Sequence, residues 1–216
     1  MDRQDALDKI EEVEKTDSAY VKIGNDASTL VVTFAGNHHG GFARKTNLTE
    51  LRTERNDFDI LYMRNQGEWY LGGLNGIGET IEDTIAFLKE EFEKYDKVIC
   101  VGTSAGGYAS ILFASLCGTD PSIAITPQTD LNECLSLRKP GHLHRIKKLP
   151  SFEKYSNLNS VITDNTTYYI HNRDQRGRWE LIMHGTSHYD NIKHHPSVRW
   201  FDEWKFGEIL QKELDI

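Results

Sequence analysis

The sequence has few cysteines and no long hydrophobic run. Its 216 residues include three cysteines, Cys100, Cys117 and Cys134, and no CxxC pair. This odd and sparse set argues against a disulfide framework and favours a reducing compartment, so we expect a cytoplasmic protein. No stretch approaches the roughly 20 apolar residues that span a bilayer. The first residues, MDRQDALDKIEEVEK, are polar and acidic, unlike a secretory signal peptide.

Positive charge is scarce as well. The chain has 25 lysines and arginines against 33 aspartates and glutamates, and its net charge of −8 argues against nonspecific binding to nucleic acid. The GxGxxG and GK[ST] motifs of nucleotide binders are absent. Histidines number 9, but neither HExxH nor a Cys/His ligand set accompanies them. We therefore expect no cofactor and no catalytic metal.

Apolar and amphipathic segments alternate from about residue 28 to the end of the chain. This alternation predicts an α/β fold, a mostly parallel sheet with helices on both faces, in a single domain of residues 1–216. The carboxyl ends of such strands share one edge of the sheet, where we expect the chemistry. We predict strands at 28–36, 57–65, 97–103, 122–128, 166–172 and 179–185, helices at 78–96, 106–118 and 197–214, and an N-terminal helix within 1–20.

Residues 131–165 do not share this alternation. A connection of that length in a compact domain is usually functional, so we expect a lid-like insertion. Its segment 136–152 contains five basic residues, among them Arg145 and Lys147, and no acidic residue. We expect Arg145 and Lys147 to bind or attract an anionic substrate, with an ordinary solvated surface as the alternative.

One serine stands between two glycines, in KVICVGTSAGGYASILFASL. Ser104 follows the predicted strand 97–103 and precedes the predicted helix 106–118. Raising its hydroxyl above the sheet edge requires a sharp turn, and Gly102 and Gly106 have no Cβ to clash there. In this setting the GxSxG pattern is typical of a serine nucleophile, and a glycine-rich turn without chemistry is the alternative.

With this motif and this order of elements, the chain resembles the α/β-hydrolases. The resemblance implies a compact fold with a short lid and a serine hydrolase that cleaves a carboxylic ester through an acyl-enzyme. It implies a catalytic triad of Ser104, Asp174 and His188, because the acid follows a late strand and the histidine follows the last one. Asp130 and Asp190 remain alternative candidates for the acid. The alternative candidates for the base are His171, His184, His194 and His195.

The same resemblance implies backbone donors for the oxyanion of the reaction. One is the N–H of Ala105, and the other comes from Gly36 or Asn37 in the segment AGNHHGGF. His38 and His39 follow in that segment, and we expect them to line the mouth of the pocket.

Two functions remain as alternatives to ester hydrolysis. The motif SAGGYAS and the short lid are also similar to α/β-hydrolase-like proteins of bacterial polysaccharide and capsule pathways. That similarity implies an acyltransferase or deacetylase acting on a glycan. The other alternative is a binding module that keeps the fold without activity. In each case the expected partner is a small-molecule or glycan ester.

Overall fold

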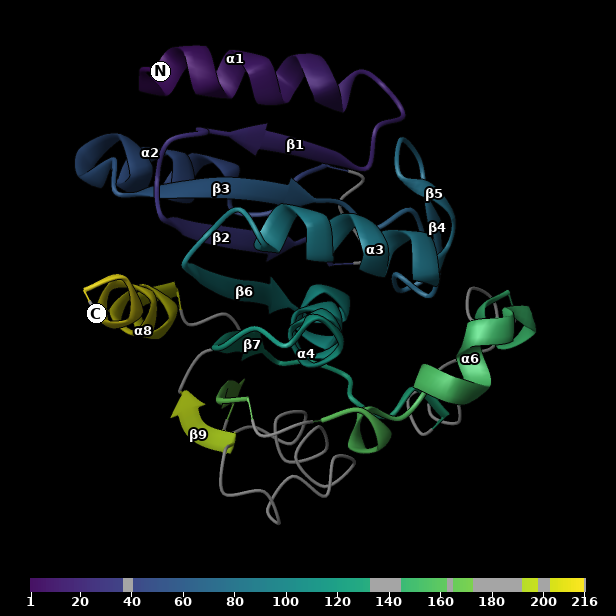
Figure 1. Cartoon of the computed structure of the whole chain (residues 1–216). Coiled ribbons are helices and arrows are strands. Elements are labelled where there is room, and N and C mark those ends of the chain that lie inside the picture. Colours follow the sequence, from purple (N-terminus) through teal and green to yellow (C-terminus); the bar gives the residue numbers. More distant parts are fainter. Residues whose placement is uncertain (37–40, 133–144, 163–164, 173–191, 198–202, 216) are drawn as a thin grey trace.

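The computed structural model describes residues 1–36, 41–132, 145–162, 165–172, 192–197 and 203–215 (Figure 1). The strands are β1 (Tyr20–Ile23), β2 (Thr29–Phe34), β3 (Phe58–Met63), β4 (Gly72–Leu74), β5 (Gly78–Thr80), β6 (Lys97–Thr103), β7 (Ser122–Ile125), β8 (Thr167–Asn172) and β9 (Ile192–Ser197). The helices are α1 (Arg3–Glu14), α2 (Lys45–Arg55), α3 (Ile81–Phe92), α4 (Ala105–Cys117), α6 (Pro150–Tyr155) and α8 (Glu203–Leu214), with 3-10 helices η1 (Ile146–Lys148) and η2 (Leu158–Ser160).

Within the described residues, seven strands form one sheet in the order β1-β3-β2-β6-β7-β8-β9. β1 runs antiparallel to β3, and the other neighbouring strands are parallel. β2, β3 and β7 consist almost entirely of buried residues, as expected where both faces of a sheet are covered. The predicted mostly parallel α/β architecture is confirmed.

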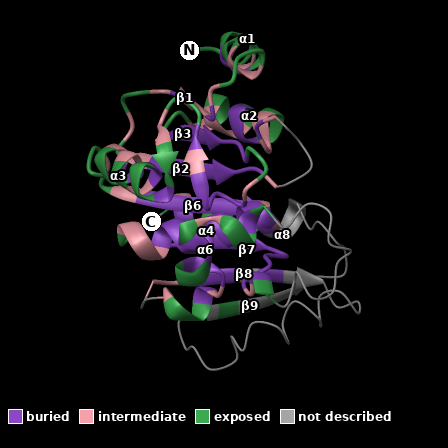
Figure 2. Cartoon of the chain, turned by 90° about the vertical axis from the view of Figure 1, so that its right-hand side faces the viewer, coloured by how far each residue is buried: buried purple, intermediate pink, exposed green. Residues whose placement is uncertain are grey.

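Helices cover both faces of this sheet. α3 and α4 pack on one face through residues such as Leu88 and Leu112, whereas α1, α2 and α8 pack on the other through Ile10, Leu48 and Leu210. Figure 2 shows α3 and α2 on opposite sides of strands coloured as buried. α3 contributes one apolar stripe to the core, whereas α4 is buried on all sides from Ala105 to Ala114. The strands supply the layer between the helices of the two faces. None of the described helices combines the length and apolar character that a membrane crossing requires.

Several boundaries differ from the sequence prediction. The predicted helix 78–96 begins only at Ile81, because Thr80 and Asp83 form a capping box that starts α3 there. The predicted strand 122–128 ends at Ile125, because Thr126 has a positive φ of 43°. β1, β4, β5 and α2 were not predicted, since short polar elements leave a weak pattern.

The last part of the sheet differs most. Strand β9 covers Ile192–Ser197, although its sequence IKHHPS includes a proline and does not look like a strand. β9 lies at the edge of the sheet, where a residue without a backbone N–H is tolerated. The predicted helix 197–214 is therefore wrong at Ser197, which ends β9, and its described part is α8 (Glu203–Leu214). Residues 198–202 lie outside the described residues. The predicted strand 179–185 lies outside the described residues.

Candidate active site

Ser104 occupies a sharp turn between β6 and α4. β6 ends at Thr103, α4 begins at Ala105, and Ser104 between them has φ 57° and ψ −119°. A residue other than glycine with positive φ is strained and persists only where its surroundings hold it. Because such strain gathers at functional sites, this backbone marks Ser104 as the centre of a candidate site.

Gly102 and Gly106 permit the turn because other backbone atoms fill the space that a side chain would need. A Cβ on Gly102 would lie 2.0 Å from the carbonyl oxygen of Gly106, and a Cβ on Gly106 would lie 2.0 Å from the carbonyl oxygen of Phe34. The crowding that the GxSxG motif predicts is therefore present. It also reaches β2, whose last residue touches the first turn of α4.

Two backbone segments meet beside Ser104. The N–H of Ala105 is at the start of α4, where helix geometry leaves it without an intrahelical partner at the positive end of the helix dipole. On the other side, a Cβ on Gly36 would lie 3.2 Å from the carbonyl oxygen of Thr103 and 3.8 Å from the Cβ of Ser104. The fold thus brings Gly36 and Ala105 to the serine. Asn37, His38 and His39 lie outside the described residues.

The Ser104 side chain contacts Gln128, a residue that the sequence analysis did not select. Ser104 Oγ donates a hydrogen bond to Gln128 Oε1 over 3.1 Å, and Gln128 is 1% exposed. Gln128 follows β7 by three residues, and β7 is the strand next to β6. A polar residue just past a buried strand was the available signal. The sequence alone could not show that Gln128 lies near Ser104, because this depends on β7 being the neighbour of β6.

Asp130, the alternative acid, is held by its own loop. Asn157 Nδ2 donates to Asp130 Oδ2 over 2.8 Å, and the backbone N–H of Asn132 donates to Asp130 Oδ1 over 2.9 Å. The carboxylate therefore ties the segment after β7 to the segment before η2. Asp174 comes two residues after Asn172, where β8 ends, and lies outside the described residues together with Asp190.

The predicted histidines fall into two groups. His171 lies in β8 and the pair His194–His195 lies in β9, whereas His184 and His188 are outside the described residues. β9 runs parallel to β8 and ends with Ser197 opposite Asn172, near the edge that carries Ser104. Because β9 follows His188 in the chain, His188 does not come after the last strand as the sequence analysis expected. His195, two residues from the end of β9, is therefore its competitor. Among the described residues, no cluster of three or more His, Cys, Asp or Glu could hold a metal ion.

Arg44 is another residue near the serine that the sequence analysis did not select. It lies in the loop after β2 with a positive φ of 59°. Its Nη2 donates to Thr103 Oγ1 over 3.4 Å, and its guanidinium carbon lies 4.1 Å from the ring centroid of Phe206 in α8. A positive charge is thus fixed beside the residue that precedes Ser104. Nothing local marks this contact in the sequence, because Arg44 and Thr103 are 59 positions apart.

The described part of the predicted lid is packed against the molecule. α6 lies on the side to which the arrowheads of β3 and β6 point (Figure 1). Ser151 Oγ in α6 donates to the carbonyl oxygen of Leu71, and the Tyr108 hydroxyl in α4 donates to the carbonyl oxygen of Tyr155 over 2.6 Å. Because Tyr108 is one helical turn after Ser104, this bond attaches the lid close to the serine.

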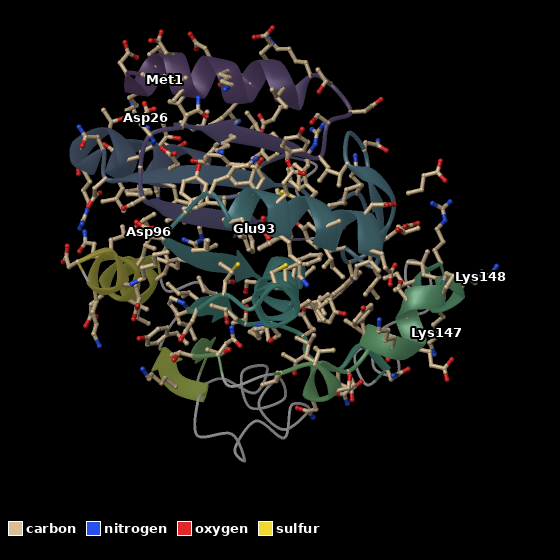
Figure 3. The ribbon with its side chains drawn as sticks, viewed as in Figure 1. Met1, Asp26, Glu93, Asp96, Lys147 and Lys148 are labelled. Atoms are coloured by element: carbon tan, nitrogen blue, oxygen red, sulfur yellow. The ribbon has the colours of Figure 1, made fainter. Side chains whose placement is uncertain are left out.

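Arg145, Lys147 and Lys148, the described basic residues of the segment 136–152, lie on the outer side of the lid. Arg145 and Lys147 are exposed, while Ile146 between them is buried. Figure 3 shows Lys147 and Lys148 beside α6 at the periphery of the molecule. The described charges therefore face solvent at the carboxyl edge of the sheet.

Solved structures match the chain, whereas no protein-family model and no curated protein sequence does. The capsule O-acetyltransferase of Neisseria meningitidis serogroup A has a TM-score of 0.67 and 13% identity, covering 92% of both chains. The fluorophosphonate-binding serine hydrolase F of Staphylococcus aureus has a TM-score of 0.61 and 12% identity, covering 93% of this chain and 98% of that chain. Esterase B of Lactobacillus rhamnosis has a TM-score of 0.55 and 12% identity, covering 99% of this chain and 93% of that chain.

These matches span nearly the whole chain. At such low sequence identity they show a shared fold and not a shared activity. The mostly parallel sheet and the serine turn between β6 and α4 agree with them. The chain has the α/β-hydrolase fold.

Proposed function

We propose that the chain is a serine hydrolase that cleaves a carboxylic ester through an acyl-enzyme on Ser104. The observation that carries this proposal is the strained backbone of Ser104 at the start of α4, with the N–H of Ala105 and the backbone of Gly36 beside it. A serine hydrolase and an esterase share the fold, which supports the reaction class.

Each residue then has a chemical role. Ser104 Oγ attacks the ester carbonyl carbon while His188 accepts the serine proton. The N–H of Ala105 and a second N–H from the segment of Gly36 stabilise the negative charge on the carbonyl oxygen. The tetrahedral intermediate collapses as His188 gives the proton to the leaving alcohol. Asp174 holds the imidazole in the correct tautomer and stabilises its positive form.

Transfer of the acyl group to a glycan hydroxyl is the second candidate function. It is supported by the fold likeness to the capsule O-acetyltransferase, one structure of which is in complex with CoA. Acylation of Ser104 would be the same in both reactions, and only the acceptor of the acyl group would differ. Acetyl-CoA and an acetyl ester, each with and without added sugar, would distinguish the two.

A fluorophosphonate probe tests the proposal directly, because it reacts with activated serines. The native protein should be labelled on Ser104, and Ser104→Ala should lose both the label and ester hydrolysis. Ser110→Ala is the matched control, since Ser110 is buried in the same helix and its hydroxyl donates to the carbonyl oxygen of Gly107. Labelling of a different serine contradicts the assignment. A native protein that is neither labelled nor active supports the non-catalytic module.

A further inference from the structure

The N-terminal helix ends beside the loop that leads to the serine. α1 lies beyond β1 at one end of the sheet, and its last turn is on the side to which the arrowheads of β3 and β6 point (Figure 1). The loop between β2 and α2 covers residues 35–44 and includes the backbone of Gly36 that meets Ser104. Its described final part, residues 41–44, is the part that α1 approaches.

Glu14, the last residue of α1, binds this loop with both carboxylate oxygens. Its Oε1 accepts a hydrogen bond from the backbone N–H of Phe42 over 3.0 Å, and its Oε2 accepts one from Lys45 Nζ at the start of α2. Partial burial acts to raise the pKa of Glu14, but the bonds from Lys45 and Phe42 and the charge of Arg64 hold that pKa below its usual range. Glu14 is therefore a carboxylate anion at neutral pH.

This position is unfavourable for the helix itself. α1 has no basic residue in its last turn, and a carboxylate there faces the negative end of the helix dipole. The buried guanidinium of Arg64 offsets this, because it donates to the carbonyl oxygen of Glu14 over 3.3 Å and to that of Thr16. Its central carbon also lies 5.3 Å from the ring centroid of Phe42. Arg64 thus holds the end of α1 and the Phe42 ring side by side.

A short series of contacts connects Phe42 to the nucleophile. Arg44, two residues after Phe42, has a φ of 59°, and its Nη2 donates to Thr103 Oγ1 over 3.4 Å. Thr103 immediately precedes Ser104, and its carbonyl oxygen would lie 3.2 Å from a Cβ on Gly36. Both ends of the loop therefore meet the residue before the serine, and Glu14 fixes the loop just before its second contact.

We propose that Glu14 is a positioning residue, which holds the loop 35–44 so that the backbone of Gly36 stays on the oxyanion side of Ser104. This inference rests on the serine hydrolase proposed above. Glu14 touches no reacting atom and acts through Phe42. Because negative charge develops on the carbonyl oxygen only in the transition state, a displaced loop lowers kcat and leaves substrate binding largely unchanged.

The test measures hydrolysis of p-nitrophenyl acetate by the native protein and three variants. Glu14→Ala removes both bonds to the loop, whereas Glu14→Gln keeps an oxygen that can accept from the N–H of Phe42. Lys9→Ala is the control in the same helix, because it removes the bond from Lys9 Nζ to the carbonyl oxygen of Lys22 in β1 and leaves the contacts of Glu14 in place. The final amount of fluorophosphonate label counts the folded sites, so that kcat is expressed per labelled site.

Glu14→Ala should lower kcat per labelled site roughly tenfold, with KM within about twofold of the native value. Glu14→Gln should retain at least about a third of the native kcat, and Lys9→Ala should stay within about twofold of it. A merely structural role would reduce the number of labelled sites and leave kcat per site unchanged. That result, or an equal fall in kcat per site in Lys9→Ala or Glu14→Gln, overturns the proposal.

Should Glu14→Ala fail to fold, Glu14→Asp decides. It keeps the negative charge, but its carboxylate is one methylene short of the Phe42 N–H. A lower kcat per labelled site with KM unchanged supports the proposal, and a native kcat overturns it. A native protein with neither hydrolysis nor label overturns the proposed function and this inference with it, whereas an active native protein with an unimpaired Glu14→Ala variant overturns this inference alone.

Discussion

The Tyr70 hydroxyl donates a hydrogen bond to the carbonyl oxygen of Ala35, 2.9 Å away and one residue before Gly36. The Tyr70 ring is buried and packs edge-on against Phe34, with 5.5 Å between ring centroids. Burial raises the pKa of the Tyr70 hydroxyl well above its usual range, so the hydroxyl stays protonated and can donate. A buried side chain thus anchors the end of β2, where the backbone of Gly36 meets Ser104.

Tyr70→Phe should weaken this anchor. We expect a loss of about 1–2 kcal/mol in the free energy of unfolding, and a roughly tenfold lower kcat with little change in KM, because a displaced Gly36 segment stabilises the oxyanion less well. Tyr108→Phe removes a comparable buried bond, to Tyr155 on the lid side, and serves as the control. Urea unfolding and ester hydrolysis measure both effects. Equal losses of kcat in the two variants would contradict a special role for the Tyr70 contact.

Gly106→Ala should destabilise the protein by about 2 kcal/mol or more, since its Cβ would overlap the carbonyl oxygen of Phe34 and force β2 and α4 apart. Gly207→Ala in α8 is the matched control. Among the described residues, no atom outside the helix backbone lies within 4 Å of a Cβ there, so alanine should stabilise the helix by up to about 1 kcal/mol. Urea midpoints for both variants provide the comparison. A Gly106→Ala protein as stable as the native one would refute the packing argument.

Asp174→Asn should lower kcat by about four orders of magnitude, the size expected when the orienting acid of a triad is lost. Asp130→Asn should cost less than about tenfold, because the Asp130 carboxylate is occupied by Asn157 and by the backbone of Asn132. Steady-state hydrolysis of one ester by both variants is sufficient. If Asp130→Asn lowered kcat more than Asp174→Asn, Asp130 would be the acid of the triad.

His188→Ala should also lower kcat by several orders of magnitude, because Ser104 would lose its general base. His195→Ala is the informative partner variant, since His195 lies in β9 close to the carboxyl edge of the sheet. We expect it to retain most of the native activity and the fluorophosphonate label. An inactive His195→Ala beside an active His188→Ala would reassign the base.

The basic residues of the lid should attract anionic esters over neutral ones. We expect this preference to fade with added salt, because screening acts over about 10 Å at 0.1 M, and to vanish in Arg145→Ala with Lys147→Ala. The control removes two lysines at the opposite edge, Lys89→Ala with Lys212→Ala. Values of kcat/KM for matched esters at low and high salt report the outcome. Equal kcat/KM for anionic and neutral esters at every salt concentration would show that the segment is an ordinary solvated surface.

The serine turn and the central strands could be predicted because their causes are local. Strand 97–103 is a short apolar run, and Gly102 meets the backbone of Gly106 four positions later, across the turn at Ser104. The close approach of Gly106 to Phe34 in β2 is the long-range part of the same crowding. The fold class followed from the alternation of such segments. The ends of elements were harder to place, because a capping box or one residue with positive φ sets them, as at Thr80 and Thr126.

The sequence by itself determined that a serine would stand at the end of a buried strand, at the start of a helix, on one edge of a parallel sheet. Only the tertiary structure decided which side chains meet it there. Gln128 reaches Ser104 because β7 pairs with β6 in a particular register, with Thr103 opposite Ile125. Arg44 contacts the neighbouring Thr103 from the loop after β2, and Tyr70 contacts Ala35 from the segment between β3 and β4. These contacts depend on strand order and register over tens of residues, and a local pattern of apolar and polar residues specifies neither.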